Sequence, residues 1–307
     1  MLNTGRLNIF REVVDRGSFS AAADALSYSQ SAVSQAIATL EGEVGAPLIE
    51  RSRGGVRPTP AGAALAGHVG GILAQMEAAE AEIGAIGAGH GGRLRTASFP
   101  TAGATLMPQA IAGFRASHPG VDVTLAEGEP EEIGLRLRAG EFDLVLLFEF
   151  EGVGERLGAG IRRFELLDDP LHLALRHDHP LAGREQLRLE DLRKESWVQT
   201  SASSPCAKHV VRSCHAAGFE PSVSFESDDY QTVQGLVAAG VGVALIPQLA
   251  LSAIRDDIRV RALHPASPVR KVIAATPRAA AVTPAVATML DVLREVSRTR
   301  AAQPAVR

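Results

Sequence analysis

One predicted helix carries short polar side chains on the face where an ordinary surface helix carries charges. It lies in SFSAAADALSYSQSAVSQAIATLE, residues 18–41, and continues to Val44. Its apolar residues recur at helical spacing and are Val33, Ile37, Leu40 and Val44. At about 100° per residue, the opposite face holds Ser31, Ser34, Gln35, Ala38 and Gly42. Hydroxyl and amide groups hydrogen-bond to base edges, and short side chains let a helix enter a major groove about 12 Å wide, so this face predicts readout of duplex DNA.

Two shorter elements must hold that helix in place. Leu7, Phe10, Val13 and Val14 indicate a first helix, which ends at Gly17. Ser18 can cap a second helix containing Ala21, Ala22, Ala23 and Leu26, and Ser29 can cap the third after the break SYS. Helix, tight turn and helix is the spacing of a helix-turn-helix motif, in which Ser29, Gln30 and Ser31 begin the recognition helix.

The stretch APLIERSRGGVRPTPAG, residues 46–62, predicts a wing. Gly54 and Gly55 allow a tight turn between two short extended pieces that carry Arg51, Arg53 and Arg57. The net charge of −4 does not indicate a nucleic-acid partner, so these arginines must supply the attraction to phosphate or to a minor groove. We expect base readout from Gln30, Ser34 and Gln35, and anchoring from Ser29, Ser31, Arg51 and Arg53.

The run from Gly17 to Gly62 resembles the DNA-binding domain of the LysR-type transcriptional regulators. The resemblance implies a bacterial transcription factor that binds promoter operator DNA as a homodimer or homotetramer, with RNA polymerase as a further candidate partner. Three positions depart from the family pattern. Ser31 replaces the usual Pro, Gln35-Ala36 replaces an Arg-Gln pair, and Ile49 replaces a common Phe. The first two alter the groove face, so no operator sequence is carried over. The alternative is that these helices cap a core or bind a protein.

A heptad seam follows the wing. Its apolar positions alternate spacings of four and three and are Leu65, Val69, Ile72, Met76, Ala79, Ile83 and Ile86. A seam of this kind favours a partner helix from a second subunit, and the alternative is packing on its own domain. The glycine-rich stretch GAGHGGR, residues 87–93, then predicts a hinge, because it lacks the Gly-Lys-Ser/Thr signature of a phosphate loop.

The C-terminal two thirds contain a weak internal repeat. Residues 95–147 and 196–247 both read as strand, Ser/Thr turn, helix, strand, acidic turn, helix and strand. This order predicts two α/β subdomains with largely parallel sheets and a cleft at the carboxyl ends of the strands. Residues 161–177 are the expected first crossover, and residues 269–277 with a helix over 283–299 are expected to return to the first subdomain.

This C-terminal part resembles the family's effector-binding domain, which is akin to periplasmic binding proteins. The expected α/β chain therefore comprises a winged helix-turn-helix over 1–60, a dimerising linker helix over 61–88 and an effector-binding domain over 93–300. Within that domain, subdomain I is expected over about 93–162 and 269–300, and subdomain II over about 163–268.

Position in this pattern predicts the lining of the cleft. The expected residues are Ser98, Phe99, Thr101, Phe148, Thr200, Ser201 and Asp228. Hydroxyls and helix-start N–H groups suit a carboxylate or another small polar effector, and the two phenylalanines suit an apolar portion of it. Inward-facing acids would repel an anion, and the candidates are Glu127, Glu129, Glu149, Asp228 and Asp229. The alternative for Ser98 and Ser201 is helix capping alone.

Two cysteines allow a thiol switch as an alternative, because a peroxide-sensing branch of the family uses two in this region. If Cys214 in CHAAG is matched to the second cysteine of that branch, the first falls on Pro205 rather than Cys206. In one helix, Cys206 and Cys214 would lie about 12 Å apart, which is beyond disulfide reach. His177 and His179 lack a further metal ligand nearby, and a surface turn is the better interpretation.

Other classes of protein find no support in the sequence. No Gly-x-Ser-x-Gly, His-Glu-x-x-His or complete phosphate-loop motif occurs, so we expect no enzyme, no catalytic residue, no metal and no cofactor. A transporter-type binding protein needs an export signal, which MLNTGRLNIF does not resemble, and no apolar run of about 18 residues could span a bilayer. We therefore expect a cytoplasmic regulator. A ligand-independent DNA-binding protein is the remaining alternative.

Overall fold

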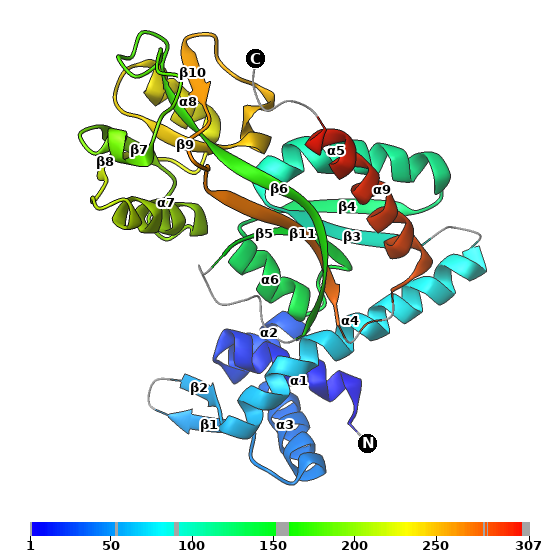
Figure 1. Ribbon diagram of the computed structural model, residues 1–307. Helices are drawn as coiled ribbons and strands as arrows, with labels where there is room; N and C mark the ends of the chain where they lie inside the picture. Colours follow the sequence, from blue (N-terminus) through cyan, green and yellow to red (C-terminus); the bar gives the residue numbers. More distant parts are fainter. Residues whose placement is uncertain are drawn as a thin grey trace.

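The computed structural model describes residues 2–52, 55–88, 92–151, 160–278, 280 and 282–302. Its first part is a winged helix-turn-helix (Figure 1). The elements are α1 (Thr4–Arg16), α2 (Phe19–Leu26), α3 (Gln30–Val44), β1 (Ile49–Ser52) and β2 (Gly55–Pro58). The two strands pair antiparallel with Ser52 opposite Gly55, so the expected wing is confirmed.

Polar side chains begin each of these helices. Asn3, Ser18 and Ser29 accept hydrogen bonds from backbone N–H groups three residues further along, so each helix starts at a capped turn. Gly17 ends α1 with a φ of +61°, in the left-handed region that favours glycine. The inward residues of α3 are correct for Val33, Ile37 and Leu40 but wrong for Val44, which is exposed because α3 ends there beyond its last core contact.

Helix α4 (Pro60–Ala88) is the expected linker helix, and it begins inside the DNA-binding domain. Leu65, Val69 and Leu73 pack with the core of α1 and α3. Ile72 and Met76 are 37% and 41% exposed. The seam is therefore divided, because Leu65 and Val69 are used by the chain's own core, whereas Ile72 and Met76 are exposed and can meet another helix. The side chains of Ile83 and Ile86 lie outside the described residues.

The internal repeat is confirmed as two units with the same order of elements. The first unit comprises β3 (Arg93–Ser98), α5 (Pro100–Ser117), β4 (Asp122–Glu127), α6 (Pro130–Arg138) and β5 (Leu144–Phe150). The second comprises β7 (Ser196–Gln199), α7 (Pro205–Ala216), β8 (Ser222–Glu226), α8 (Tyr230–Ala238) and β9 (Ala244–Pro247). Short 3₁₀ helices η1 (Leu189–Leu192) and η2 (Gln248–Ser252) lie beside the second unit.

Two long strands join the units. These are β6 (Ile161–Arg176) and β11 (Val269–Pro277), after which α9 (Pro284–Ala301) returns to the first unit and packs on α5. The expectation of largely parallel sheets is wrong for these crossovers. The chain leaves along β6 and returns along β11, so the two strands run antiparallel, and β6 also pairs antiparallel with β9 and β10 (Ile258–Arg261). Parallel pairing is kept within the repeats, for β3 with β4 and β5 and for β7 with β8.

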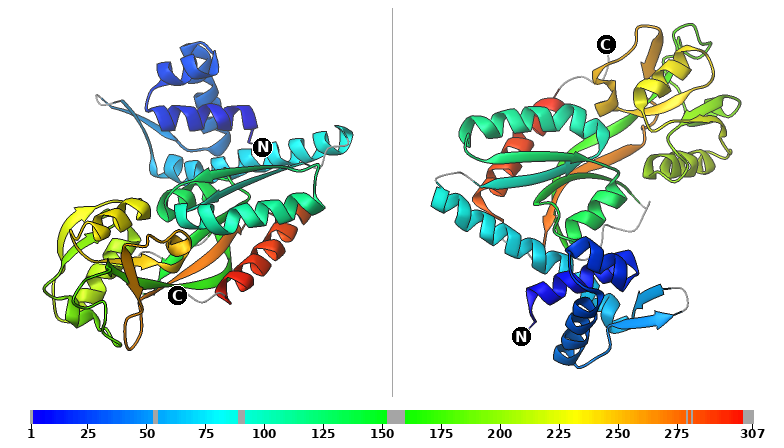
Figure 2. Two further views of the ribbon diagram at one scale, coloured as in Figure 1. Left: turned by 90° about the horizontal axis from the view of Figure 1, so that it is seen from above. Right: turned by 180° about the vertical axis from the view of Figure 1, so that it is seen from behind.

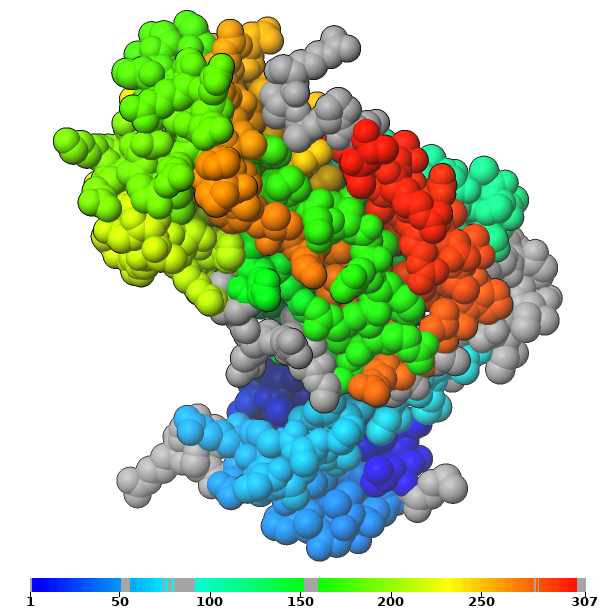
Figure 3. Space-filling model, viewed as in Figure 1, coloured from blue at the N-terminus to red at the C-terminus, as the bar shows by residue number. Residues whose placement is uncertain are grey.

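Strand β6 belongs to both units. Its residues up to Pro170 pair with β11, and those from Leu171 onward pair with β9 and β10. Helices α5 and α9 cover one face of the first unit, while α6 packs on the other face in a separate apolar cluster (Figure 2). The blue and cyan DNA-binding domain forms a distinct lobe at one end (Figure 3). The subdomain boundaries stay a prediction.

Candidate DNA-binding face and effector pocket

The polar face of α3 is open to a ligand. Ser29, Gln30, Ser31 and Gln35 are exposed, and Ser34 is half-buried. Ser29 Oγ accepts a hydrogen bond from Ala32 N at 3.1 Å and lies 3.0 Å from Ser31 Oγ, so both hydroxyls stand at the helix start. The side chain of Arg51 and the whole of Arg53 lie outside the described residues. The DNA-contacting roles of all these residues stay predictions.

One carboxylate fixes the wing relative to the recognition helix. Glu41 Oε1, on α3, accepts hydrogen bonds from Leu48 N at 2.7 Å and from Ile49 N at 3.2 Å, at the start of β1. Tyr28 is a surface candidate that the sequence interpretation passed over as part of a break. It is 55% exposed and immediately precedes Ser29, and the signal available in the sequence was an aromatic residue beside the expected helix cap.

A small cavity of about 30 Å³ lies where the two units meet. It is lined by Phe99, Pro100, Thr101, Glu129, Phe148, Thr200, Ser204, Cys206, Asp228, Tyr230 and Arg270. The structure therefore brings together five of the predicted residues, which are Phe99, Thr101, Phe148, Thr200 and Asp228. Their role as effector contacts stays a prediction. We call this cavity the effector pocket.

Ser98 and Ser201 do not line the effector pocket. Ser98 is buried, and its hydroxyl donates to the carbonyl of Phe99 at 3.1 Å. Ser201 N donates to Asp228 Oδ1 at 2.8 Å, which holds that carboxylate at the pocket edge. Neither serine caps a helix, and Ser204 caps α7 instead, with its hydroxyl accepting from Ala207 N at 3.1 Å.

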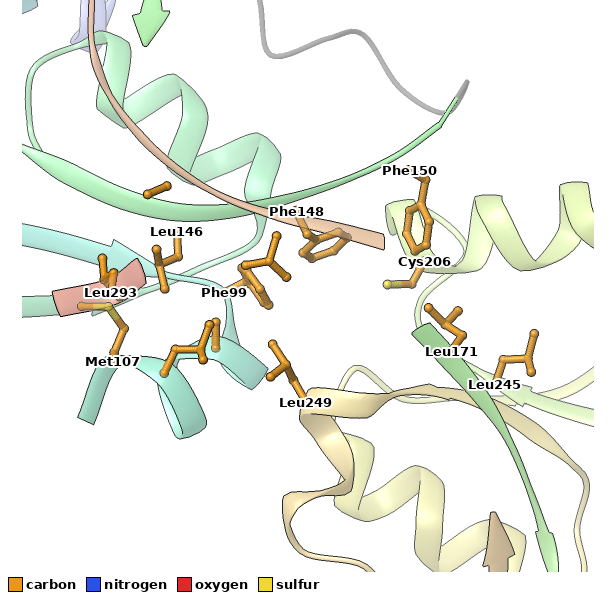
Figure 4. Close-up of a cluster of buried hydrophobic side chains, with 14 of the residues drawn as sticks. Phe99, Met107, Leu146, Phe148, Phe150, Leu171, Cys206, Leu245, Leu249 and Leu293 are labelled. Atoms are coloured by element: carbon orange, nitrogen blue, oxygen red, sulfur yellow. The ribbon is translucent and has the colours of Figure 1, made fainter. Parts of the chain in front are cut away.

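Arg270 occupies the inner part of the pocket and was missed in the sequence. Its Nε donates to Asp169 Oδ2 at 2.7 Å, and its Nη2 donates to Thr101 Oγ1 at 2.6 Å. The guanidinium carbon lies 4.9 and 4.7 Å from the ring centres of Phe99 and Phe148, whose side chains Figure 4 shows together. Arg270 is only 1% exposed, and the signal available was a cation within the apolar strand VRKVIAATP.

The charge of Arg270 is compensated inside the protein. Burial alone would lower its pKa, but the neighbouring Asp169 raises it, and the group stays charged with a pKa above its ordinary value. Asp169 Oδ1 also accepts from Leu249 N at 3.0 Å, so the pair links the first unit, through Thr101, to η2. Partial burial, followed by repulsion from Asp228 and Glu131, raises the pKa of Glu129 at the mouth.

The two thiols are poorly placed for oxidation. Cys206 lines the pocket, and its burial raises the pKa of the thiol. Burial likewise raises the pKa of Cys214 to about 12. Because the thiolate is the reactive form, both positions disfavour reaction with peroxide. Within the part of the chain that the structure describes, no group of His, Cys, Asp and Glu could hold a metal ion, and His179 instead lies 3.3 Å from Glu195.

His209, on α7, stacks on Phe150 at the end of β5, with ring centroids 4.1 Å apart. Burial, aided by Arg212, lowers its pKa from 6.5 to about 4. Between pH 4 and pH 6.5, His209 of the unfolded chain binds more protons than His209 of the folded chain. The contribution of this residue to the free energy of unfolding is therefore fully present above about pH 6.5 and is lost toward pH 4. We expect His209→Gln to flatten urea midpoints measured between pH 7 and 4.5. His215→Gln, on an exposed position of the same helix, is the control, and equal slopes for both variants would contradict the assignment.

A winged helix-turn-helix joined to two α/β units with a pocket between them is the architecture of a DNA-binding protein that carries a ligand-binding type of domain. Residues 4–63 match the family described as bacterial regulatory helix-turn-helix protein, lysR family. Residues 87–298 match the LysR substrate binding domain. The chain belongs to the LysR family of DNA-binding transcriptional regulators, and the resemblance seen in the sequence is confirmed.

Individual relatives match most or nearly all of the chain. A probable HTH-type transcriptional regulator, LrrA of Synechococcus elongatus, is 33% identical over 303 residues, covering 96% of this chain and 98% of that protein. The DNA-binding transcriptional dual regulator OxyR of Escherichia coli is 28% identical over 81% of this chain and 80% of its own. The fold matches full-length CbnR bound to its target DNA, with a TM-score of 0.64 at 22% identity, over 96% of this chain and 100% of that one. No helix in the described residues combines the length and apolar character that a membrane span requires.

Proposed function

We propose that this protein binds operator DNA through α3 and the wing, and that a small molecule in the effector pocket changes this binding. The observation that carries the proposal is a pocket built from both α/β units on the same chain as an exposed, uncharged recognition face. A ligand that favours one arrangement of the units shifts the population of DNA-binding assemblies. The protein acts on promoters in the bacterial cytoplasm, with RNA polymerase as a candidate partner.

The pocket supports an effector that is not a simple anion. Arg270 already donates to Asp169 and Thr101, so its charge is not free for a ligand carboxylate. Glu129 and Asp228 add negative charge at the mouth. The hydroxyls of Thr200, Ser204 and Tyr230 also line the pocket, beside the aromatic rings of Phe99 and Phe148, and the hydrogen bond between Thr200 and Ser204 can be exchanged for one to a ligand. A small polar effector with a neutral or cationic donor group and an apolar part fits this lining.

Assembly through α4 completes the proposal. Two copies of α3 are needed to read two half-sites, and the exposed Ile72 and Met76 supply an apolar face for a second copy of the helix. Homodimers that pair further into tetramers through the effector domains would space these DNA-binding domains along the operator. A ligand-independent regulator stays the alternative, and the raised thiol pKa values weigh against the redox alternative.

Gln35→Ala and Arg53→Ala test the DNA-binding assignment. Gln35→Ala should change sequence preference and cost about 1–3 kcal/mol on the preferred sequence, because an amide reads a base edge. Arg53→Ala should weaken specific and random DNA alike and reduce the salt slope by about 1, because an arginine neutralises phosphate. The measurement is titration of genome-selected fragments and random DNA at several salt concentrations, with genome-wide occupancy of the double variant in cells. Equal effects of both variants on both kinds of DNA would contradict these roles.

A further inference from the structure

We infer that helix α6 transmits the state of the effector pocket to the linker helix α4, and that the contact between Ala139 and Gly70 is where it does so. The inference rests on the proposed function and adds a physical route to it. The route needs three features. One end of α6 must lie at the pocket, its body must be able to move as a unit, and its other end must press on the DNA-binding part of the chain.

The first end of α6 lies in the pocket wall. Glu129 is the N-cap residue of α6 and lines the pocket. The negative charge of Asp228, from the second unit, repels the Glu129 carboxylate. No side chain caps this helix start. Whatever neutralises or separates the two carboxylates therefore acts directly on the residue from which α6 begins.

The body of α6 is short, continuous and packed separately from the main core. Ile133 and Leu137 pack with Val145, Leu147 and Ile273 in a cluster distinct from the one that contains α5 and α9. Its nine residues span about 13 Å at the usual helical rise. Packed helices shift relative to their neighbours by about 1–2 Å in regulatory transitions. A displacement at Glu129 would therefore reach the far end of the helix with little loss.

The second end of α6 lies closely against α4, where the backbone and the methyl group of Ala139 face Gly70. A Cβ built on Gly70 would lie 2.9 Å from Ala139 O and 3.3 Å from Ala139 Cβ, at the C-cap of α6. Figure 1 shows this end of α6 next to the first half of α4. On α4, Val69 and Leu73 are core residues of the DNA-binding domain. Because no flexible side chain separates Ala139 from Gly70 to absorb the movement, a shift of Ala139 moves α4 together with that domain.

The experiment uses two glycines of the same helix. Gly70→Ala places a methyl group against Ala139 O, whereas Gly67→Ala meets nothing within 4 Å. Both substitutions raise helix propensity alike, so only the contact with α6 differs. Each is combined with Glu129→Gln, which removes one pocket charge and acts as the probe. Dissociation constants of the full-length variants are measured on a fragment selected from genomic DNA by the wild-type protein, at one salt concentration.

We expect Glu129→Gln to change the dissociation constant by about twofold to thirtyfold in the wild type and in Gly67→Ala. In Gly70→Ala this change should be lost. Ala139→Gly removes the facing methyl group without adding volume and should weaken the response in the same way. This variant keeps the test decisive if Gly70→Ala does not fold. An equal response in all backgrounds would overturn the route through Gly70 but leave the proposed function intact. No response in any background would overturn the coupling of pocket and DNA, and this inference with it.

Discussion

Replacing Asp169 with alanine is expected to lower the free energy of unfolding by about 3–5 kcal/mol, because it leaves the guanidinium of Arg270 buried without its counter-charge. Arg270 is 1% exposed, so water cannot replace the lost carboxylate. The same change removes the acceptor of Leu249 N, so a second buried donor loses its partner. The measurement is the urea midpoint of the purified full-length protein.

Asp168→Ala is the matched control for this change. Asp168 is the preceding residue of β6 and is exposed, so its loss should alter stability by less than about 0.5 kcal/mol. The double variant Asp169→Ala/Arg270→Met should recover much of the loss, because a buried ion pair can be replaced by apolar side chains of similar volume. A small effect of Asp169→Ala, equal to that of Asp168→Ala, would show that the ion pair does not hold the two units together.

Gly62→Ala is expected to lower the free energy of unfolding of the DNA-binding domain by about 1–3 kcal/mol and to weaken DNA binding. The reason is that the added methyl group overpacks a close backbone contact. At Gly62, the first turn of α4 lies against the carbonyl group of Leu48, and a Cβ would also lie 3.2 Å from Pro58 Cβ. Thr59 fixes this approach, since its hydroxyl accepts from Gly62 N at 3.0 Å and donates to Pro47 O at 2.7 Å. Relief would require the wing to move relative to α3.

Gly67→Ala again supplies the comparison. Position 67 is open, so this variant should be unchanged or more stable by about 0.5–1 kcal/mol, the usual gain of alanine over glycine within a helix. The measurements are thermal unfolding and the dissociation constant for the selected DNA fragment. If Gly62→Ala behaved like Gly67→Ala, the close packing of α4 on the start of the wing would not be important for DNA binding.

Local patterns in the sequence were sufficient for the DNA-binding domain and for the order of elements in the repeat. Ser18 and Ser29 cap helices, and Gly17 ends one, because these positions depend on neighbours within a few residues. The crossover strands were located correctly, but their antiparallel direction follows from how the chain returns between units, which no local pattern specifies. The packing partner of Leu65 and Val69 could not be predicted from local pattern either, since a heptad seam does not specify which helix packs against it.

The effector pocket was predictable mainly where it follows strand ends. Phe99, Thr101 and Thr200 come directly after β3 and β7, so the repeat placed them near the cleft. Arg270 and Cys206 came from elsewhere, a returning strand and the first turn of a helix, and their side chains enter the pocket because of tertiary packing. Ser98 was expected to line the cleft but is buried, because a residue at a strand end can point either into the cleft or into the core.

The division of α4 between two tasks limits how this regulator can be recombined with others. Leu65, Val69 and Leu73 complete the hydrophobic core that α1 and α3 cannot close alone. A fragment cut at the end of the wing would expose that core to solvent and lose the side chains of α4 that pack on α1. A chimaera that gives this DNA-binding specificity to another sensor must therefore keep the native helix through Leu73 and place its junction beyond it.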